Sequence, residues 1–179
     1  SEMVDDLFEM SKINAGAVTV PFDAVALDEV VDEVAVAHRP TAERAGVSLS
    51  TELPDAPVQV TGSGRALVRI LGNLVANAIA HTPEGGRVTL SVGGDGQYAW
   101  VRVDDTGVGI AEADLMRVFD VAYRGSNGRV PRPDSTLPSG SGLGLAIAAG
   151  LAAAHQGTVT AQNLPVGARF EVRLPIGGG

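Results

Sequence analysis

Apolar residues recur at three- and four-residue intervals along three segments of the chain and alternate with polar residues along several shorter ones. The first pattern predicts helices at 27–45, 64–80 and 142–155. The second predicts strands at 18–22, 47–51, 58–61, 87–92, 98–103, 158–163 and 168–174. Strands that share a chain with a few helices and end in a hairpin favour an α+β fold over a regularly alternating parallel sheet. We expect a two-layer α/β sandwich with a mixed sheet and about three helices.

The N-terminal segment has a wide apolar stripe of its own. Met3, Leu7 and Met10 lie at helical spacing, and Gly16 marks the expected end of this helix. A stripe this wide on a terminal helix calls for partner helices, so we interpret residues 1–16 as the end of a helical hairpin. A helix folded back on its own domain is the alternative.

Composition and charge narrow the classes of function. The chain has 179 residues, of which 45% are hydrophobic, enough for a packed core in one domain. It has no cysteine for a disulfide or a thiolate metal site, which suits a cytoplasmic protein. No apolar run is long enough to span a bilayer, and the acidic start is unlike a signal sequence, so we expect a soluble fragment. The net charge of -8 argues against nucleic-acid binding, because a phosphate backbone needs clustered lysine and arginine.

Two asparagines interrupt the apolar face of the helix predicted at 64–80. Asn77 projects at nearly the same angle as Ile70, and Asn73 lies at the edge of the stripe. A partly buried amide is unfavourable unless it forms a hydrogen bond or binds a ligand, so each asparagine needs a partner. The two are either core asparagines with partners in the protein or part of a binding site.

Two glycine-rich segments have the form of ligand-binding turns. The strand predicted at 98–103 runs into Asp105, Gly107 and Gly109, where a ligand could approach the backbone and the carboxylate could accept a hydrogen bond from an exocyclic amine. The segment 139–147 opens a helix with three glycines, which leaves backbone N–H groups facing a phosphate. A dinucleotide-binding motif would need a strand immediately before it, whereas a long polar loop precedes it here.

That loop, residues 125–142, is rich in proline, glycine and serine and has almost no apolar periodicity. Loops this long inside a compact domain are either functional lids or disordered segments. Because both of its flanks carry phosphate-type chemistry, we interpret it as a mobile lid.

Four motifs in this order resemble the ATP-binding catalytic domain of sensor histidine kinases, within the wider gyrase, heat-shock chaperone, histidine kinase and MutL ATPase group. They are an N box at 73–83, a first glycine box at 105–109, an F box at 117–125 and a second glycine box at 140–145. The resemblance covers nearly the whole chain. It implies ATP and Mg²⁺ as cofactors and transfer of the ATP γ-phosphate to a protein histidine.

The resemblance also implies a role for each motif residue. Asn77 would coordinate Mg²⁺, Asp105 would read the adenine amine, and residues 120–139 would close over the nucleotide as an ATP lid. Asn73, Asn77 and Arg124 form the expected catalytic set. The expected nucleotide-binding residues are Asn77, His81, Asp105, Gly107, Gly109, Ile110, Tyr123, Gly140, Ser141, Gly142, Leu143, Gly144 and Leu145.

The position four residues before Asn77 decides the class of chemistry. The related ATP hydrolases carry a glutamate there that activates water, whereas this chain has Asn73. A neutral amide cannot act as a general base, so transfer to a positioned nucleophile is favoured over hydrolysis. Two further departures from the pattern are Ala80, in place of a common basic residue, and Ala122, in place of a phenylalanine. The alternatives are therefore an ATPase or clamp of the wider group and a catalytically degenerate nucleotide-binding module.

The expected context of the chain follows from the same resemblance. Residues 1–16 would end a dimerisation and phosphoacceptor hairpin, 17–176 would form the catalytic domain, and 177–179 would be a tail. No acceptor-type motif surrounds any of the three histidines, so the acceptor would lie on a hairpin absent from this chain. The expected partners are that hairpin, in a homodimer of the full-length kinase, and a response regulator of a two-component phosphorelay. We expect a cytoplasmic location, with the full-length parent anchored in the inner membrane.

Overall fold

The structure is a computed structural model that describes residues 2–14, 22–120 and 144–176. Within these ranges the helices are α1 (Glu2–Asn14), α2 (Leu27–Ala45), α3 (Gly64–His81), the 3-10 helix η1 (Glu112–Asp114) and α4 (Gly144–Ala154). The strands are β1 (Asp23–Ala26), β2 (Ser48–Glu52), β3 (Gln59–Gly62), β4 (Arg87–Gly94), β5 (Tyr98–Asp105), β6 (Thr158–Asn163) and β7 (Ala168–Pro175). None of the helices in these ranges has both the length and the apolar character needed to cross a membrane.

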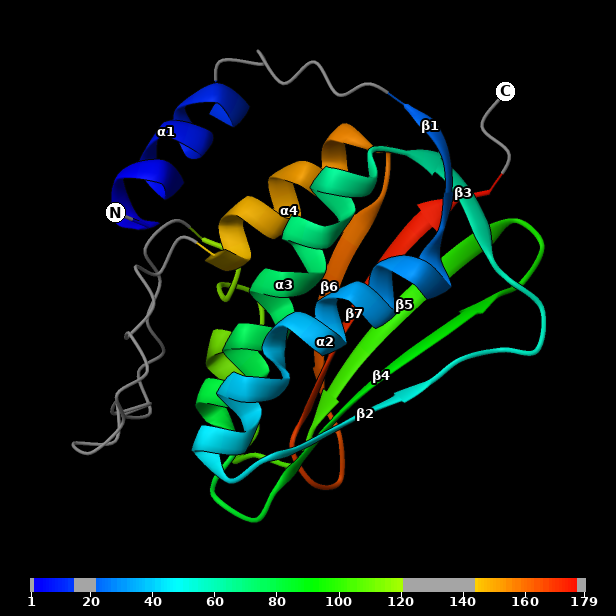
Figure 1. The fold of residues 1–179 in the computed structure, drawn as a ribbon. Helices are drawn as coiled ribbons and strands as arrows, with labels where there is room; N and C mark the ends of the chain where they lie inside the picture. The colour runs from blue at the N-terminus through cyan, green and yellow to red at the C-terminus, as the bar shows by residue number, and fades with distance from the viewer. Residues whose placement is uncertain (1, 15–21, 121–143, 177–179) are drawn as a thin grey trace.

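Five of the strands form one mixed sheet in the order β2-β4-β5-β7-β6. β2 runs parallel to β4, and the other neighbours are antiparallel. Helices α2, α3 and α4 cover one face of this sheet, while β1 and β3 pair separately beside the start of α2 (Figure 1). The expected α+β sandwich of two layers with a mixed sheet is therefore confirmed.

The core lies between the sheet and the three covering helices. Val88, Leu90 and Val92 of β4 are buried, and the residues between them face the other side of the sheet. α3 supplies the opposing surface with the buried side chains Leu67, Ile70, Leu71, Leu74, Val75, Ala78 and Ile79. Each large aliphatic side chain buried in this way contributes about 1.5–3 kcal/mol, so these two faces hold α3 firmly against the sheet.

His155 joins the end of α4 to the start of α3. Its ring is buried, with Nε2 3.1 Å from the backbone nitrogen of Ser63 and Nδ1 2.8 Å from the carbonyl oxygen of Leu151. Because a backbone N–H can only donate, Nε2 is the acceptor and Nδ1 carries the proton. The Ser63 hydroxyl in turn caps α3 by accepting a hydrogen bond from the backbone N–H of Ala66. His155 is thus a neutral core residue that fixes α3 and α4 to each other.

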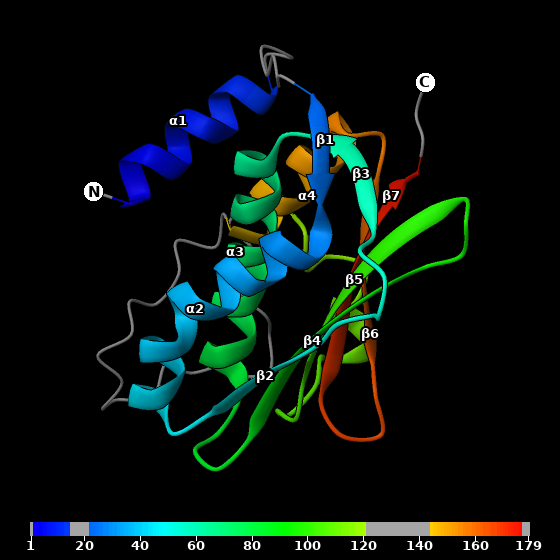
Figure 2. The same ribbon diagram turned by 45° about the vertical axis from the view of Figure 1, so that its right-hand side comes forward.

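α1 lies beside α4, on the side away from the sheet (Figures 1 and 2). Asp6 of α1 forms an ion pair with Arg69 of α3. Val4, Leu7 and Phe8, three and four residues apart, are each more than half exposed. One side of α1 therefore packs on the domain while an apolar side faces outward. The interpretation of residues 1–16 as the end of a dimerisation hairpin stays a prediction.

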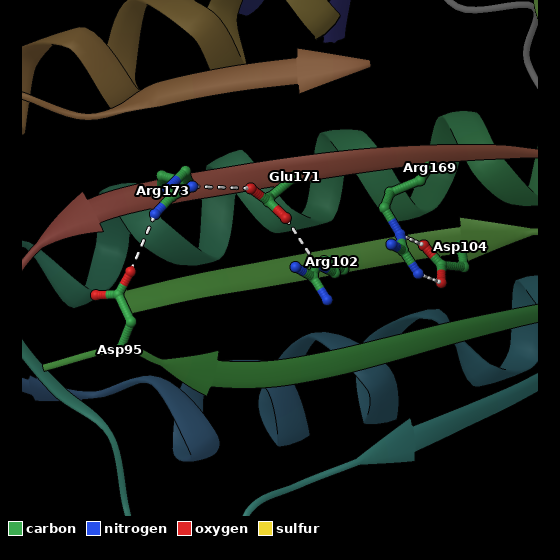
Figure 3. Close-up of polar contacts among 6 residues, drawn as sticks. All are labelled: Asp95, Arg102, Asp104, Arg169, Glu171 and Arg173. Carbon is green, nitrogen blue, oxygen red and sulfur yellow. Dashed lines mark hydrogen bonds and ion pairs between the residues drawn. The ribbon is translucent and has the colours of Figure 1, made fainter. Parts of the chain in front are cut away.

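The face of the sheet opposite the helices carries ion pairs between charged side chains of β5, β7 and the β4–β5 turn (Figure 3). These pairs are Arg102–Glu171, Arg169–Asp104, Arg173–Asp95 and Arg173–Glu171. Arg169 donates two hydrogen bonds of 2.8 Å to the carboxylate of Asp104, and this contact raises the pKa of the guanidinium. The arginines drawn here are balanced by carboxylates, so they contribute little unpaired positive charge to this face.

Predicted and observed elements differ most around the first strand. Of the strand predicted at 18–22, residues 18–21 lie outside the described chain, and Phe22 precedes β1. β1 instead occupies Asp23–Ala26, where it pairs antiparallel with β3. Its position is set by that partner and not by its own apolar run. η1 was not predicted, while the other described helices and strands end within two residues of their predicted bounds.

Candidate functional site

One face of α3 carries the polar residues that the sequence singled out. Asn73, Asn77 and His81 follow one another at four-residue spacing, so they lie in a row about 12 Å long. The side-chain amide nitrogens of Asn73 and Asn77 are buried and have no hydrogen-bond partner in the described part of the chain. The described residues therefore leave both amide nitrogens without an acceptor, which disfavours the alternative of core asparagines with partners in the protein. Buried donors without partners are rare in proteins and point to a missing ligand.

The turn after β5 meets the C-terminal end of this row. Asp105 is 4% exposed, and its Oδ1 accepts hydrogen bonds from the backbone N–H groups of Gly107, at 2.9 Å, and Ala168, at 3.3 Å. A Cβ atom on Gly107 would lie 2.4 Å from the carbonyl oxygen of His81 and 3.0 Å from Asp105 Oδ1. Only glycine fits there without displacing the backbone of α3. The structure therefore brings Asp105, Gly107 and His81 together.

The start of α4 meets the other end of the row. A Cβ atom on Gly144 would lie 3.7 Å from Cγ of Asn73, in ordinary contact. The N–H groups in the first turn of α4 have no acceptor within the helix, and the helix dipole makes this end positive. Leu145 follows, half-buried. Asn77 thus lies between a positive helix end and a carboxylate-bearing turn.

The far side of the glycine turn is held by a residue that the sequence analysis missed. Gly109 has a left-handed φ of +78°, and Ile110 after it is buried. The side chain of Asn163, at the end of β6, accepts a hydrogen bond from the backbone N–H of Ile110 at 2.8 Å and donates one to its carbonyl oxygen at 2.7 Å. A lone asparagine at a strand end gives no signal of this contact.

Several predicted site residues lie outside the described part of the chain. They are Tyr123, Arg124, Gly140, Ser141, Gly142 and Leu143, together with residues 121–139 of the predicted lid. The described site therefore comprises α3, the turn after β5 and the first residues of α4.

Comparison with known families agrees with this arrangement. Residues 62–178 match the family described as "Histidine kinase-, DNA gyrase B-, and HSP90-like ATPase". The chain belongs to this family. The match includes all three parts of the described site, namely α3, the turn after β5 and the start of α4. It begins at Gly62, so it leaves out α1, β1, α2, β2 and all of β3 except its last residue.

Individual relatives of this ATPase family extend the likeness to most of the chain. The sensor-like histidine kinase SenX3 of Mycobacterium tuberculosis is 38% identical over 176 residues, which cover 97% of this chain and 41% of SenX3. Full-length ShkA in complex with AMPPNP has a TM-score of 0.81 at 27% identity, covering 97% of this chain and 35% of ShkA. The histidine kinase ThkA in complex with the response regulator protein TrrA shares the fold, with a TM-score of 0.74 at 21% identity over 97% of this chain and 48% of ThkA. The chain spans about two-fifths of the length of SenX3.

Proposed function

We propose that this chain is the ATP-binding catalytic domain of a sensor histidine kinase, which transfers the γ-phosphate of Mg-ATP to a histidine outside the chain. The observation that carries the proposal is the pair of buried amides, Asn73 and Asn77, that lack partners in the described chain. They lie between the start of α4 and the turn after β5. Membership of an ATPase family and the AMPPNP bound to ShkA support a nucleotide as the missing ligand.

The groups along α3 give the nucleotide a direction. The carboxylate of Asp105 suits the exocyclic amine of adenine, so the base lies at the His81 end. The N–H groups at the start of α4 suit phosphates, so the phosphates lie at the Asn73 end. Asn77, between them, offers a carbonyl oxygen of the type that Mg²⁺ prefers and an amino group that donates to phosphate. When bound, Mg²⁺ would neutralise the charge that builds up as the γ-phosphate is transferred.

Phosphotransfer is favoured over hydrolysis because of the side chain at position 73. An amide cannot remove a proton from water, so Asn73 does not serve as a general base for hydrolysis. The domain then contributes positioning and charge neutralisation, with Arg124 and Tyr123 completing the site from the lid segment. The nucleophile is an imidazole on a hairpin whose last part is residues 1–16. In the full-length protein, a cytoplasmic homodimer anchored in the inner membrane would pass the phosphate to a response regulator.

Calorimetric titration with Mg-AMPPNP tests the binding site. Asn77→Ala should weaken binding at least about tenfold, because a hydrogen bond or ligand contact to a charged group is worth about 1.5–3 kcal/mol. Gln59→Ala, at an exposed position of β3, is the control and should bind as the wild type does. Equal affinity in the wild type and Asn77→Ala would remove Asn77 from the site.

A second assay separates a kinase from an ATPase. Labelled ATP is mixed with this chain and a separate hairpin that carries the acceptor histidine of the same kinase. We expect label on the hairpin, no label on the chain alone and slow release of phosphate. Steady multiple turnover of ATP to ADP by the chain alone would instead favour an ATPase or clamp.

A further inference from the structure

Asn163 makes two hydrogen bonds to one residue of the turn after β5, residues 105–110, which we call the nucleotide-binding turn because of the function proposed above. Its amide oxygen accepts from the N–H of Ile110 at 2.8 Å, and its amide nitrogen donates to the carbonyl oxygen of Ile110 at 2.7 Å. Both polar groups of one backbone residue are therefore paired with one planar side chain. The orientation of the amide is fixed by this pairing, because a backbone N–H only donates and a carbonyl oxygen only accepts.

The other end of this turn is held by the β6–β7 hairpin, to which Asn163 also belongs. Asn163 and Ala168 are partners in the β6–β7 register, and the N–H of Ala168 donates to Oδ1 of Asp105. Gly167 packs so tightly here that a Cβ atom on it would lie 1.8 Å from the carbonyl oxygen of Asp105. The end of the β6–β7 hairpin thus fixes both Asp105 and Ile110, the two ends of the turn.

We propose that Asn163 is a positioning residue for nucleotide binding, which acts through Ile110 to hold the turn that carries Asp105 and Gly107. This inference rests on the proposed function. Asn163 need not touch the nucleotide. Its two hydrogen bonds restrict the turn to the conformation in which the Asp105 carboxylate faces the base, so the cost of ordering the turn is already met before binding.

Removing the side chain should weaken nucleotide binding and also reduce selectivity for adenine. Without Asn163 the polar groups of Ile110 turn to water, and the turn samples wider conformations. A residue that only stabilised the hairpin would lower the stability of the domain and leave the ratio of adenine to guanine nucleotide affinity unchanged. The ratio therefore distinguishes a positioning role from a structural one.

The test uses titration with Mg-AMPPNP and Mg-GMPPNP. Asn163→Ala should bind Mg-AMPPNP about tenfold more weakly, the loss expected for hydrogen bonds of this kind, and should prefer it less over Mg-GMPPNP. Asn163→Asp keeps the size of the side chain but turns a second oxygen toward the Ile110 carbonyl, so its affinity for Mg-AMPPNP should fall by as much. This second variant also provides the test if Asn163→Ala does not fold. The matched control is Gln162→Ala. Gln162 is the exposed neighbour of Asn163, and its cross-strand partner in β7 is Arg169 of the ion-pair face. Its affinity and nucleotide preference should equal those of the wild type.

The outcomes separate the two proposals. A wild type that binds Mg-AMPPNP, together with Asn163 variants of unchanged affinity and unchanged preference, would overturn the positioning role alone. A wild type that binds no nucleotide would overturn the proposed function and this inference with it. Variants that are less stable but keep the wild-type preference for Mg-AMPPNP would also contradict the positioning role.

Discussion

Substituting alanine for Gly167 tests whether the β6–β7 hairpin supports the turn at 105–110, which we propose binds the nucleotide. Gly167 has a φ of +83°, and a Cβ atom on it would lie 1.8 Å from the carbonyl oxygen of Asp105. Real Cβ atoms keep at least 3.0 Å from such neighbours, so the hairpin and the turn must separate by about 1.2 Å. That movement lengthens the 3.3 Å hydrogen bond between the N–H of Ala168 and Asp105 beyond useful range.

A second glycine of the chain is the control for the free-energy cost of placing an alanine in the left-handed backbone conformation. Gly96, in the β4–β5 turn, has a φ of +88° and no atom within 4 Å of where its Cβ would lie. The left-handed conformation costs an alanine roughly 1–2 kcal/mol, and both variants bear that cost. The steric conflict and the lost hydrogen bonds apply to Gly167→Ala alone. We therefore expect a loss of about 3–5 kcal/mol for Gly167→Ala and about 1–2 kcal/mol for Gly96→Ala.

The free energy of unfolding of both variants can be measured by urea denaturation. The chain has a single tryptophan, Trp100, in β5, whose fluorescence can report the transition. Midpoints are compared at equal slope, so that the difference reflects stability and not the extent of unfolding. Mg-AMPPNP affinity is measured on the folded variants, and Gly167→Ala should lose affinity while Gly96→Ala keeps it. If the two variants unfold within about 1 kcal/mol of each other, the close packing of Gly167 on Asp105 does not support the turn.

Two further changes test the contacts that hold the scaffold. His155→Ala should lower the free energy of unfolding by about 1–3 kcal/mol, because it leaves the buried backbone N–H of Ser63 unpaired. Thermal and urea unfolding would measure this loss. An unchanged unfolding midpoint would show that His155 does not link α3 to α4. The pKa of the Asp95 carboxyl is lowered, chiefly by the hydrogen bond from the backbone N–H of Tyr98. The ionised carboxylate therefore stabilises the fold fully above the ordinary carboxyl pKa of about 4, and this stabilisation is lost as the pH falls through the lowered pKa. Asp95→Asn removes this titration, so the difference in melting temperature between wild type and variant should be constant from about pH 5 to 8 and decrease below about pH 4. A difference that does not change with pH would contradict the lowered pKa of Asp95.

The parts of the fold that depend on local pattern were predictable from the sequence. α3 was expected at 64–80 and spans Gly64–His81, because its apolar residues repeat at helical spacing and Ser63 caps its start. The same periodicity identified Asn73 and Asn77 as polar residues on an inward face. The structure buries both amide nitrogens and places Asn73 beside the start of α4. Where one helix carries both the core and the polar residues, their relative placement follows from the helix geometry alone.

The contacts that could not be predicted join residues far apart in the sequence. Asn163 and Ile110 are 53 positions apart, and His155 and Ser63 are 92 apart. Neither pair has a spacing or composition that identifies it, because its proximity depends on the strand order and on the register of β6 with β7. An isolated asparagine at a strand end and an isolated histidine at a helix end therefore resemble ordinary surface or capping residues until the sheet is assembled.

α3 has two structural demands that conflict, and the site depends on how they are reconciled. Its buried aliphatic side chains hold it to the sheet, while Asn73 and Asn77 bring unpaired amide donors into the same protein interior. Each unpaired donor costs about 1–3 kcal/mol, which a leucine at either position would avoid. The helix tolerates that cost because Ile70 and Leu71 anchor it before the asparagines and Ile79 anchors it after them. In the proposed function, a nucleotide that supplies acceptors to both amides would recover the lost hydrogen bonds, so the free energy lost in the free domain would be regained on binding.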